Sequence, residues 1–90
     1  MPTVRFTYAL KRFFDDLEEI EVDPCELPAI LTAIDDNWKG IRNYIVDEQG
    51  TLRKHVNIFV DGELIKDRNE LSDQVSPNSE VYIFQALSGG

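Results

Sequence analysis

The sequence predicts an α+β domain in which a mixed sheet of four to five strands carries one main helix on one face. Three stretches, residues 3–8, 19–23 and 56–60, alternate apolar and polar residues with the period of two that is typical of half-buried strands. One stretch between them has apolar residues at helical spacing, and 90 residues allow one small core. We expect residues 1–86 to form this domain and residues 87–90 to form a flexible C-terminal tail.

The first two strands are expected to form a hairpin. Apolar and polar residues alternate over residues 3–8, and again over residues 19–23 after an acidic turn. This pattern predicts two half-buried strands, most simply as the two arms of one hairpin. Pro24 ends the second arm because a proline cannot continue a central strand ladder.

The main helix is predicted between Pro28, which suits a first helical turn, and Gly40, which suits a helix end. Apolar residues in this stretch are spaced by three, one, three and four residues, which places them on one stripe of an α-helix. The apolar segment over residues 41–45 fits either a short helix or an irregular connection, and residues 47–51 read as a polar loop. The stripe consists of Leu27, Ile30, Leu31, Ile34 and Trp38.

A second hairpin is predicted around Asp61-Gly62, a dipeptide that favours a tight turn between two strands. Residues 56–60 alternate before this turn, and residues 63–65 supply a short return arm. We expect one helical turn over residues 69–75, followed by a turn over residues 76–79.

The last strand is expected over residues 81–86 and is apolar on both faces, which is typical of a strand in the middle of a sheet. One amphipathic helix can cover only one face of the sheet, so the other face stays in water. We expect the last strand to pair in parallel with the first strand. This arrangement is the β-grasp fold of ubiquitin-like proteins.

Charge and composition exclude several classes of function. The net charge of −8 repels phosphate backbones, so we expect no nucleic-acid partner; the same charge either steers the chain toward electropositive partners or keeps it soluble. No apolar stretch approaches the about 20 residues that a membrane span needs. A single cysteine, Cys25, allows no intrachain disulfide and fits a reducing compartment. We expect a cytoplasmic protein that is monomeric when free.

The sequence predicts neither a catalytic nor a metal site. His55 has no acidic or cysteine partner at metal-ligand spacing, and Cys25 has no base or second thiol nearby in sequence. Adjacent acidic pairs such as Asp15-Asp16 point in different directions and read as solvated surface. We therefore expect that the chain is not an enzyme by itself and binds no cofactor and no metal.

The final Gly89-Gly90 is the pattern that indicates a function. Glycine has no Cβ, so a diglycine can pass through a narrow channel and a nucleophile can approach its carbonyl closely. Residues 86–90 can extend about 17 Å, which lets the Gly90 carboxylate enter a partner's active site while the folded body stays outside. A carboxylate must first be activated, normally as an acyl-adenylate made from ATP. Another protein must therefore supply the enzyme.

Two segments and the order of the elements resemble the MoaD/ThiS family of ubiquitin-like sulfur carriers, and most closely its CysO-like branch. The segments are VNIFVDGELI, residues 56–65, and NSEVYIFQALSGG, residues 78–90. Residues 37–41, NWKGI, match a further pattern of that branch after the helix. The resemblance spans nearly the whole chain.

The resemblance implies that an E1-like enzyme of the ThiF/MoeB type uses ATP to adenylate Gly90. A sulfur donor then converts this terminus to a thiocarboxylate, which gives its sulfur to a biosynthetic acceptor enzyme. Leu87, Ser88 and Gly89 are implied to be the tail that threads the partner's active site. Gly90 is implied to be the point of adenylation and thiocarboxylation.

The resemblance also implies a docking surface on the uncovered face of the sheet. Phe84 and Leu64 fall on the family's docking positions, although each fits ordinary sheet packing equally well. Thr7 stands where the family has an exposed aromatic residue on its first strand. Because of this departure, the resemblance does not identify which partner docks on this face.

Two further functions fit the same residues. In a ubiquitin-like protein modifier, the activated Gly90 would be joined to lysines, and in a plain β-grasp interaction domain the tail would be incidental. The acceptor of the sulfur also stays open, because molybdopterin, thiazole and cysteine biosynthesis and tRNA thiolation all use this carrier chemistry.

Overall fold

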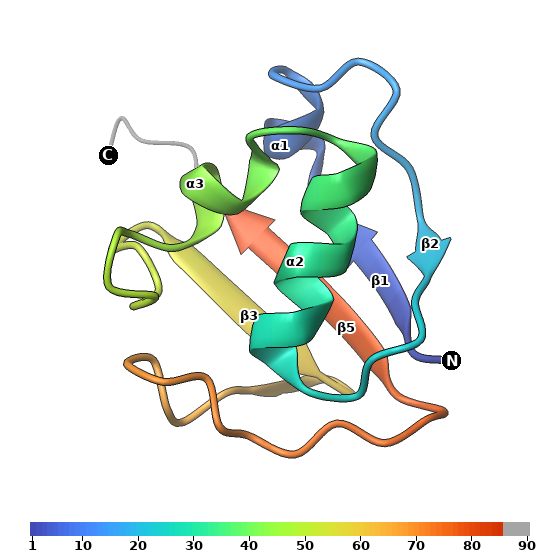
Figure 1. Cartoon of the computed structure of the whole chain (residues 1–90), viewed down its shortest axis with the longest axis vertical. Helices are drawn as coiled ribbons and strands as arrows, with labels where there is room; N and C mark the ends of the chain where they lie inside the picture. The colour runs from blue at the N-terminus through green and yellow to red at the C-terminus, as the bar shows by residue number, and fades with distance from the viewer. Residues whose placement is uncertain (86–90) are drawn as a thin grey trace.

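A five-stranded mixed sheet with one main helix across one face forms the body of the computed structural model (Figure 1). The structure describes residues 1–85, so the predicted tail, residues 87–90, and the predicted boundary at residue 86 lie outside the described residues. The strands are ordered β2-β1-β5-β3-β4. The predicted α+β class and β-grasp arrangement are confirmed.

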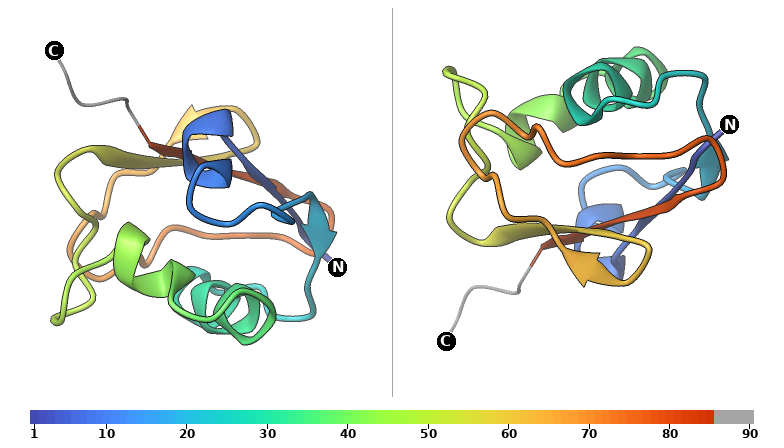
Figure 2. Two further views of the ribbon diagram at one scale, coloured as in Figure 1. Left: turned by 90° about the horizontal axis from the view of Figure 1, so that it is seen from above. Right: turned by 90° about the horizontal axis from the view of Figure 1, so that it is seen from below.

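The last strand joins the two halves of the sheet. It pairs in parallel with the first strand, as the sequence predicts, and antiparallel with the third. Figure 2 shows α2 and α3 on the same side of this sheet. The elements are β1 Thr3–Phe6, α1 Tyr8–Lys11, β2 Ile20–Glu21, α2 Leu27–Asn37, α3 Ile41–Ile45, β3 Val56–Val60, β4 Glu63–Leu64 and β5 Glu80–Gln85.

The predicted main helix is confirmed as α2. Its apolar stripe is buried against the sheet, and Gly40, with φ +96°, turns the chain into α3. The apolar segment whose type the sequence left open is therefore helical. The two helices cover the same face because each buries its apolar side chains there.

β5 is apolar on both faces, but only one of these faces is buried. Val81 and Ile83 face the core and have no exposed surface, whereas Tyr82 points to the other face and is 38% exposed. Because the helices cover only one face, the apolar side chains on the second face form a surface. The strand is central in the sheet without being buried on both sides.

The first strand ends earlier than its alternation predicts. β1 stops at Phe6, and Thr7 begins the short helix α1, which carries Leu10 into the core. Tyr8, expected in the strand, lies in this helix and is 80% exposed. Burial of Leu10 is a tertiary contact that a four-residue helix does not reveal in its sequence pattern.

The helical turn expected over residues 69–75 does not form. The carboxylate of Asp67 accepts hydrogen bonds from the backbone N–H groups of Asn69 and Glu70, at 3.1 and 3.0 Å, and so closes a local turn instead. Leu71 follows with φ +56° and places its side chain in the core, 2% exposed. The hydrogen bonds to the Asp67 carboxylate therefore determine the local conformation, although the apolar residues of this segment have helical spacing.

The Asp61-Gly62 turn is confirmed and is tied to the start of β5. Asp61 and Gly62 have φ +52° and +85°, as a tight hairpin turn requires. The Asp61 carboxylate accepts hydrogen bonds from the Glu80 N–H at 2.9 Å and from the Ser79 hydroxyl at 2.7 Å. These two donors lower the pKa of Asp61 from its ordinary value of 3.8.

We expect the Asp61→Asn variant to unfold at a lower temperature than wild type at pH 7 and to lose less stability in acid. Because the folded-state pKa lies below the unfolded value, the carboxylate stabilises the fold above about pH 3.8 and stops doing so as the pH falls through the lowered pKa. Thermal unfolding between pH 7 and pH 2 measures both effects. The control is Asp16→Asn, whose carboxylate accepts no hydrogen bond within residues 1–85; an identical acid response in both variants would contradict the assignment.

Candidate functional site

The described residues contain no metal site and no membrane span. Across residues 1–85, no three His, Cys, Asp or Glu side chains come together to hold an ion. The same range contains no helix with the length and apolarity to cross a bilayer. Cys25 is half-buried with its Sγ 3.9 Å from the Asp23 carbonyl oxygen, and His55 is exposed beside β3.

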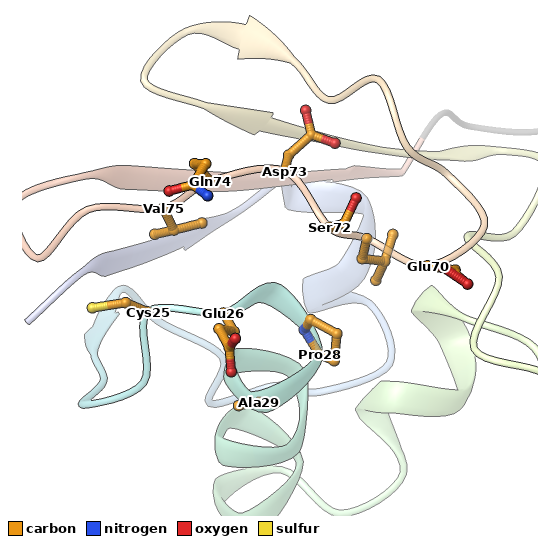
Figure 3. A pocket seen from close by; sticks show the side chains of 10 residues that line it. Cys25, Glu26, Pro28, Ala29, Glu70, Ser72, Asp73, Gln74 and Val75 are labelled. Atoms are coloured by element: carbon orange, nitrogen blue, oxygen red, sulfur yellow. The ribbon is translucent and has the colours of Figure 1, made fainter.

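A polar cleft opens between the start of α2 and the segment over residues 70–75 (Figure 3). Its carboxylates belong to Glu26, Glu70 and Asp73, and Cys25 lies at one end. The lining contains no lysine, arginine or histidine, so it offers no positive charge for an anionic substrate and no imidazole to activate Cys25.

The uncovered face of the sheet carries an aromatic and aliphatic surface. Tyr82 on β5 pairs with Phe59 on β3, and Phe59 pairs with Leu64 on β4, so the three side chains share one face. Phe84 follows two residues after Tyr82 and therefore points the same way. The ring centroids of Phe59 and Tyr82 are 6.3 Å apart, and those of Tyr82 and Phe84 are 6.4 Å apart. We call these four residues the sheet-face cluster.

The two residues implied to dock a partner both lie in the sheet-face cluster. Leu64 is 51% exposed and Phe84 is half-buried, and neither belongs to the core under α2. Sequence reasoning missed Phe59 and Tyr82. The alternation within each strand already separates them from their buried neighbours, which is the signal that could have found them. The docking role itself remains a prediction.

The cationic side chain of Arg5 lies at the border of the sheet-face cluster, in a hollow that Phe59, Tyr82 and Phe84 also line. Arg5 on β1 is paired with Tyr82 in the sheet register, and its guanidinium lies 3.0 Å from a Glu19 oxygen and 3.6 Å from a Glu80 oxygen. Both ion pairs are exposed and contribute little to stability. They compensate the charge of Arg5, so the surface that a partner would meet here is mainly apolar.

The end of β5 is where the described part of the chain stops and the predicted tail follows. Thr7, which resemblance places at an exposed aromatic position, is only 8% exposed. Its N–H donates to the Ile83 carbonyl at 3.1 Å, and its Oγ1 accepts a hydrogen bond from the Gln85 N–H at 3.2 Å. Thr7 is therefore part of the support for the end of β5 and not part of the sheet-face cluster.

A comparison with protein families identifies the family of the chain. The model of the ThiS family matches residues 5–90, which includes the whole sheet-face cluster and the diglycine. The chain belongs to the ThiS family. The ThiS-family assignment and the ubiquitin-like sulfur-carrier fold that the sequence motifs predicted are confirmed.

Solved structures with the same fold include several ubiquitin-like proteins. A chain of the BexX/CysO complex from Amycolatopsis orientalis superposes with a TM-score of 0.84 at 21% identity, covering 100% of both chains. CysO from Mycobacterium tuberculosis gives 0.81 at 22% identity, covering 97% of this chain and 100% of the other. SAMP1 from Haloferax volcanii gives 0.75 at 19% identity, covering 99% and 98%. A comparison with curated protein sequences returns no match.

ThiS-family membership indicates the class of protein to which the described residues belong. Proteins of this type are generally small, non-enzymatic carriers. The surfaces left to explain are the sheet-face cluster and the support at the end of β5. Gly90, Leu87, Ser88 and Gly89 lie outside the described residues, and their roles remain predictions.

Proposed function

We propose that this ThiS-family chain is a sulfur carrier that reacts through the carboxylate of Gly90. The observation that carries the proposal is the family match, which runs through the diglycine to residue 90. The fold supports it, because the central strand β5 leads directly from the sheet-face cluster to the residues before the diglycine. The body would dock, and residues 86–90 would present the reacting group.

The proposed chemistry takes place in partner enzymes. In an E1-like enzyme of the ThiF/MoeB type, a Gly90 carboxylate oxygen attacks the α-phosphorus of ATP, forming the acyl-adenylate and releasing pyrophosphate. Hydrosulfide from a sulfur donor attacks the carbonyl carbon, AMP leaves with its bonding electrons, and a proton is released. The thiocarboxylate then gives its sulfur to an acceptor enzyme. The carrier contributes docking, reach and a terminus that fits a narrow channel.

The proposal also assigns a docking role to the sheet-face cluster. Its exposed aromatic and aliphatic side chains form the kind of apolar centre that protein interfaces bury, and Arg5 with its two glutamates supplies a polar rim. No cofactor is proposed for the chain itself, because ATP is consumed in the activating enzyme. The cluster would be reused by the acceptor enzyme, since both partners need the same tail.

The mass of the intact protein tests the proposed function. Incubation with ATP, sulfide and the cognate E1-like enzyme should add the mass difference of one oxygen replaced by sulfur, located in the C-terminal peptide. The control is a chain truncated after Ser88, which lacks Gly89 and Gly90. Its mass should not change. If the E1-like enzyme adenylates the full chain but the mass of the chain does not change in the presence of sulfide, the sulfur-carrier proposal is overturned.

Two other outcomes would assign a different function. Branched peptides with Gly90 joined to a lysine amine would identify a protein modifier that uses the same adenylate. Full biological activity after deletion of Gly89-Gly90 would identify a plain interaction domain, because only that function does not need the carboxylate.

A further inference from the structure

Thr7 lies where the parallel neighbour of β5 stops being a strand. The pairing of β1 with β5 ends at Phe6 and Ile83, after which the Thr7 N–H still donates to the Ile83 carbonyl at 3.1 Å. In a regular parallel ladder, the next donor on β5, the Gln85 N–H, would bond to the main-chain carbonyl of Thr7. That carbonyl instead accepts the Leu10 N–H at 3.2 Å, as α1 begins. The ladder alone would leave the Gln85 N–H without its acceptor.

The hydroxyl of Thr7 supplies the missing acceptor. Its Oγ1 takes the hydrogen bond from the Gln85 N–H at 3.2 Å. A threonine that caps a helix usually uses its hydroxyl for the N–H groups of that helix, but Thr7 makes no such bond to α1. Since Thr7 is only 8% exposed, water competes little for this contact. The side chain therefore serves β5 and not the helix that it begins.

The opposite side of β5 is also fixed at this level. Asn57 and Val56 of β3 pair with Phe84 and Gln85 in the antiparallel register. Arg68 donates one hydrogen bond to Asn57 Oδ1 and another to the Arg53 carbonyl, both at 2.7 Å, which ties down the start of β3. Gln85 thus lies between a fixed strand on one side and the Thr7 hydroxyl on the other. Among these contacts, only the hydrogen bond from the Gln85 N–H to Thr7 Oγ1 joins a side chain to the Gln85 backbone.

We propose that Thr7 is a positioning residue that fixes where the tail begins. By holding Gln85 in the sheet, it fixes the position of the residue that precedes residues 86–90, and it keeps Phe84 in the sheet-face cluster. This inference rests on the proposed function, because it concerns delivery of Gly90. The five residues after Gln85 span about 17 Å when extended. Without the Thr7 bond, the position of Gln85 would be less well defined, and docking of the body would place the Gly90 carboxylate less accurately.

Amide hydrogen exchange followed by NMR tests the first half of the proposal without any partner. Thr7→Val keeps the shape and removes the hydroxyl, whereas Thr7→Ser keeps the hydroxyl. We expect exchange of the Gln85 N–H to be about 2- to 10-fold faster in Thr7→Val, as the net strength of one hydrogen bond implies, and close to wild type in Thr7→Ser. The Val81 N–H, at the other end of β5, is the internal control and should not change. Equal exchange of Gln85 in all three proteins would overturn the proposal.

Adenylation kinetics test the second half. With the E1-like enzyme, the KM for the carrier in ATP–pyrophosphate exchange should rise about 2- to 10-fold in Thr7→Val, with kcat little changed and with recovery in Thr7→Ser. A purely structural role would speed exchange along the whole of β5 and leave KM unchanged, which would overturn the positioning role. Thr7→Ala provides the same test if Thr7→Val does not fold. A wild-type chain that is not adenylated would overturn the proposed function, while the exchange experiment would still decide whether Thr7 holds Gln85.

Discussion

Extension of the chain by one alanine after Gly90 is expected to abolish adenylation while leaving the fold unchanged. The added residue displaces the carboxylate by about 3.3–3.6 Å and places a Cβ at the reacting position. Misplacement of a reacting group by about 1 Å can reduce the rate 100-fold, so we expect a loss of at least about 100-fold. ATP–pyrophosphate exchange measures the loss, and circular dichroism with thermal unfolding measures the fold.

The matched control places the same alanine between Met1 and Pro2. Because β1 and β5 run in parallel, the start of β1 lies at the opposite end of the sheet from Gln85, so this insertion should leave adenylation intact. Extension by glycine instead of alanine separates the two causes, since glycine shifts the carboxylate without adding a Cβ. Unimpaired adenylation of the alanine-extended chain would show that Gly90 is not the reacting residue.

The Leu64→Asp variant is expected to lose at least about 30-fold in kcat/KM for adenylation, with little change in thermal stability. Leu64 is 51% exposed on the short edge strand β4, so the substitution leaves the core intact. A charge at the centre of an interface is desolvated on docking, and residues at such positions often contribute about 2 kcal/mol or more to binding. Steady-state kinetics with varied carrier concentration measure the effect, which should appear mainly in KM.

The matched control is Phe13→Asp on another part of the surface. Phe13 is 54% exposed and stacks on Tyr44 of α3, with ring centroids 4.9 Å apart, so it is as accessible as Leu64 but lies outside the sheet-face cluster. It should bind and react like wild type. Equal losses in the two variants would point to a general effect of added negative charge, and an unaffected Leu64→Asp variant would remove the sheet-face cluster from the docking surface.

Local signals in the sequence predicted much of the fold. The stripe of α2 and the Asp61-Gly62 turn depend on residues close together in the chain, and both are confirmed. The end of β1 was missed because α1 depends on the burial of Leu10 against the rest of the molecule. The pattern of β5 alone does not show which face is buried, because apolar residues on both faces look the same whether the second face meets a helix or water.

The candidate site depends on contacts that a sequence pattern does not contain. Resemblance located Phe84 and Leu64, but grouping them with Tyr82 needed the register across three strands. The partner of Thr7 is the backbone of Gln85, 78 residues later, and that contact could not be predicted from local spacing. The position at which the resemblance implies an exposed aromatic residue is occupied here by Thr7, whose side chain is buried and accepts a hydrogen bond from Gln85.

The central position of β5 has a consequence for how the protein is made. During synthesis, the first strand and the β3–β4 hairpin emerge before the strand that joins them, so the sheet has no middle until residues 80–85 leave the ribosome. A product that stops before Glu80 would lack the parallel partner of β1 and expose Val4 and Ile58 to proteases. The body can therefore fold only after residues 80–85 have been synthesised. A partner that recognises the sheet-face cluster would not bind a chain that stops before them.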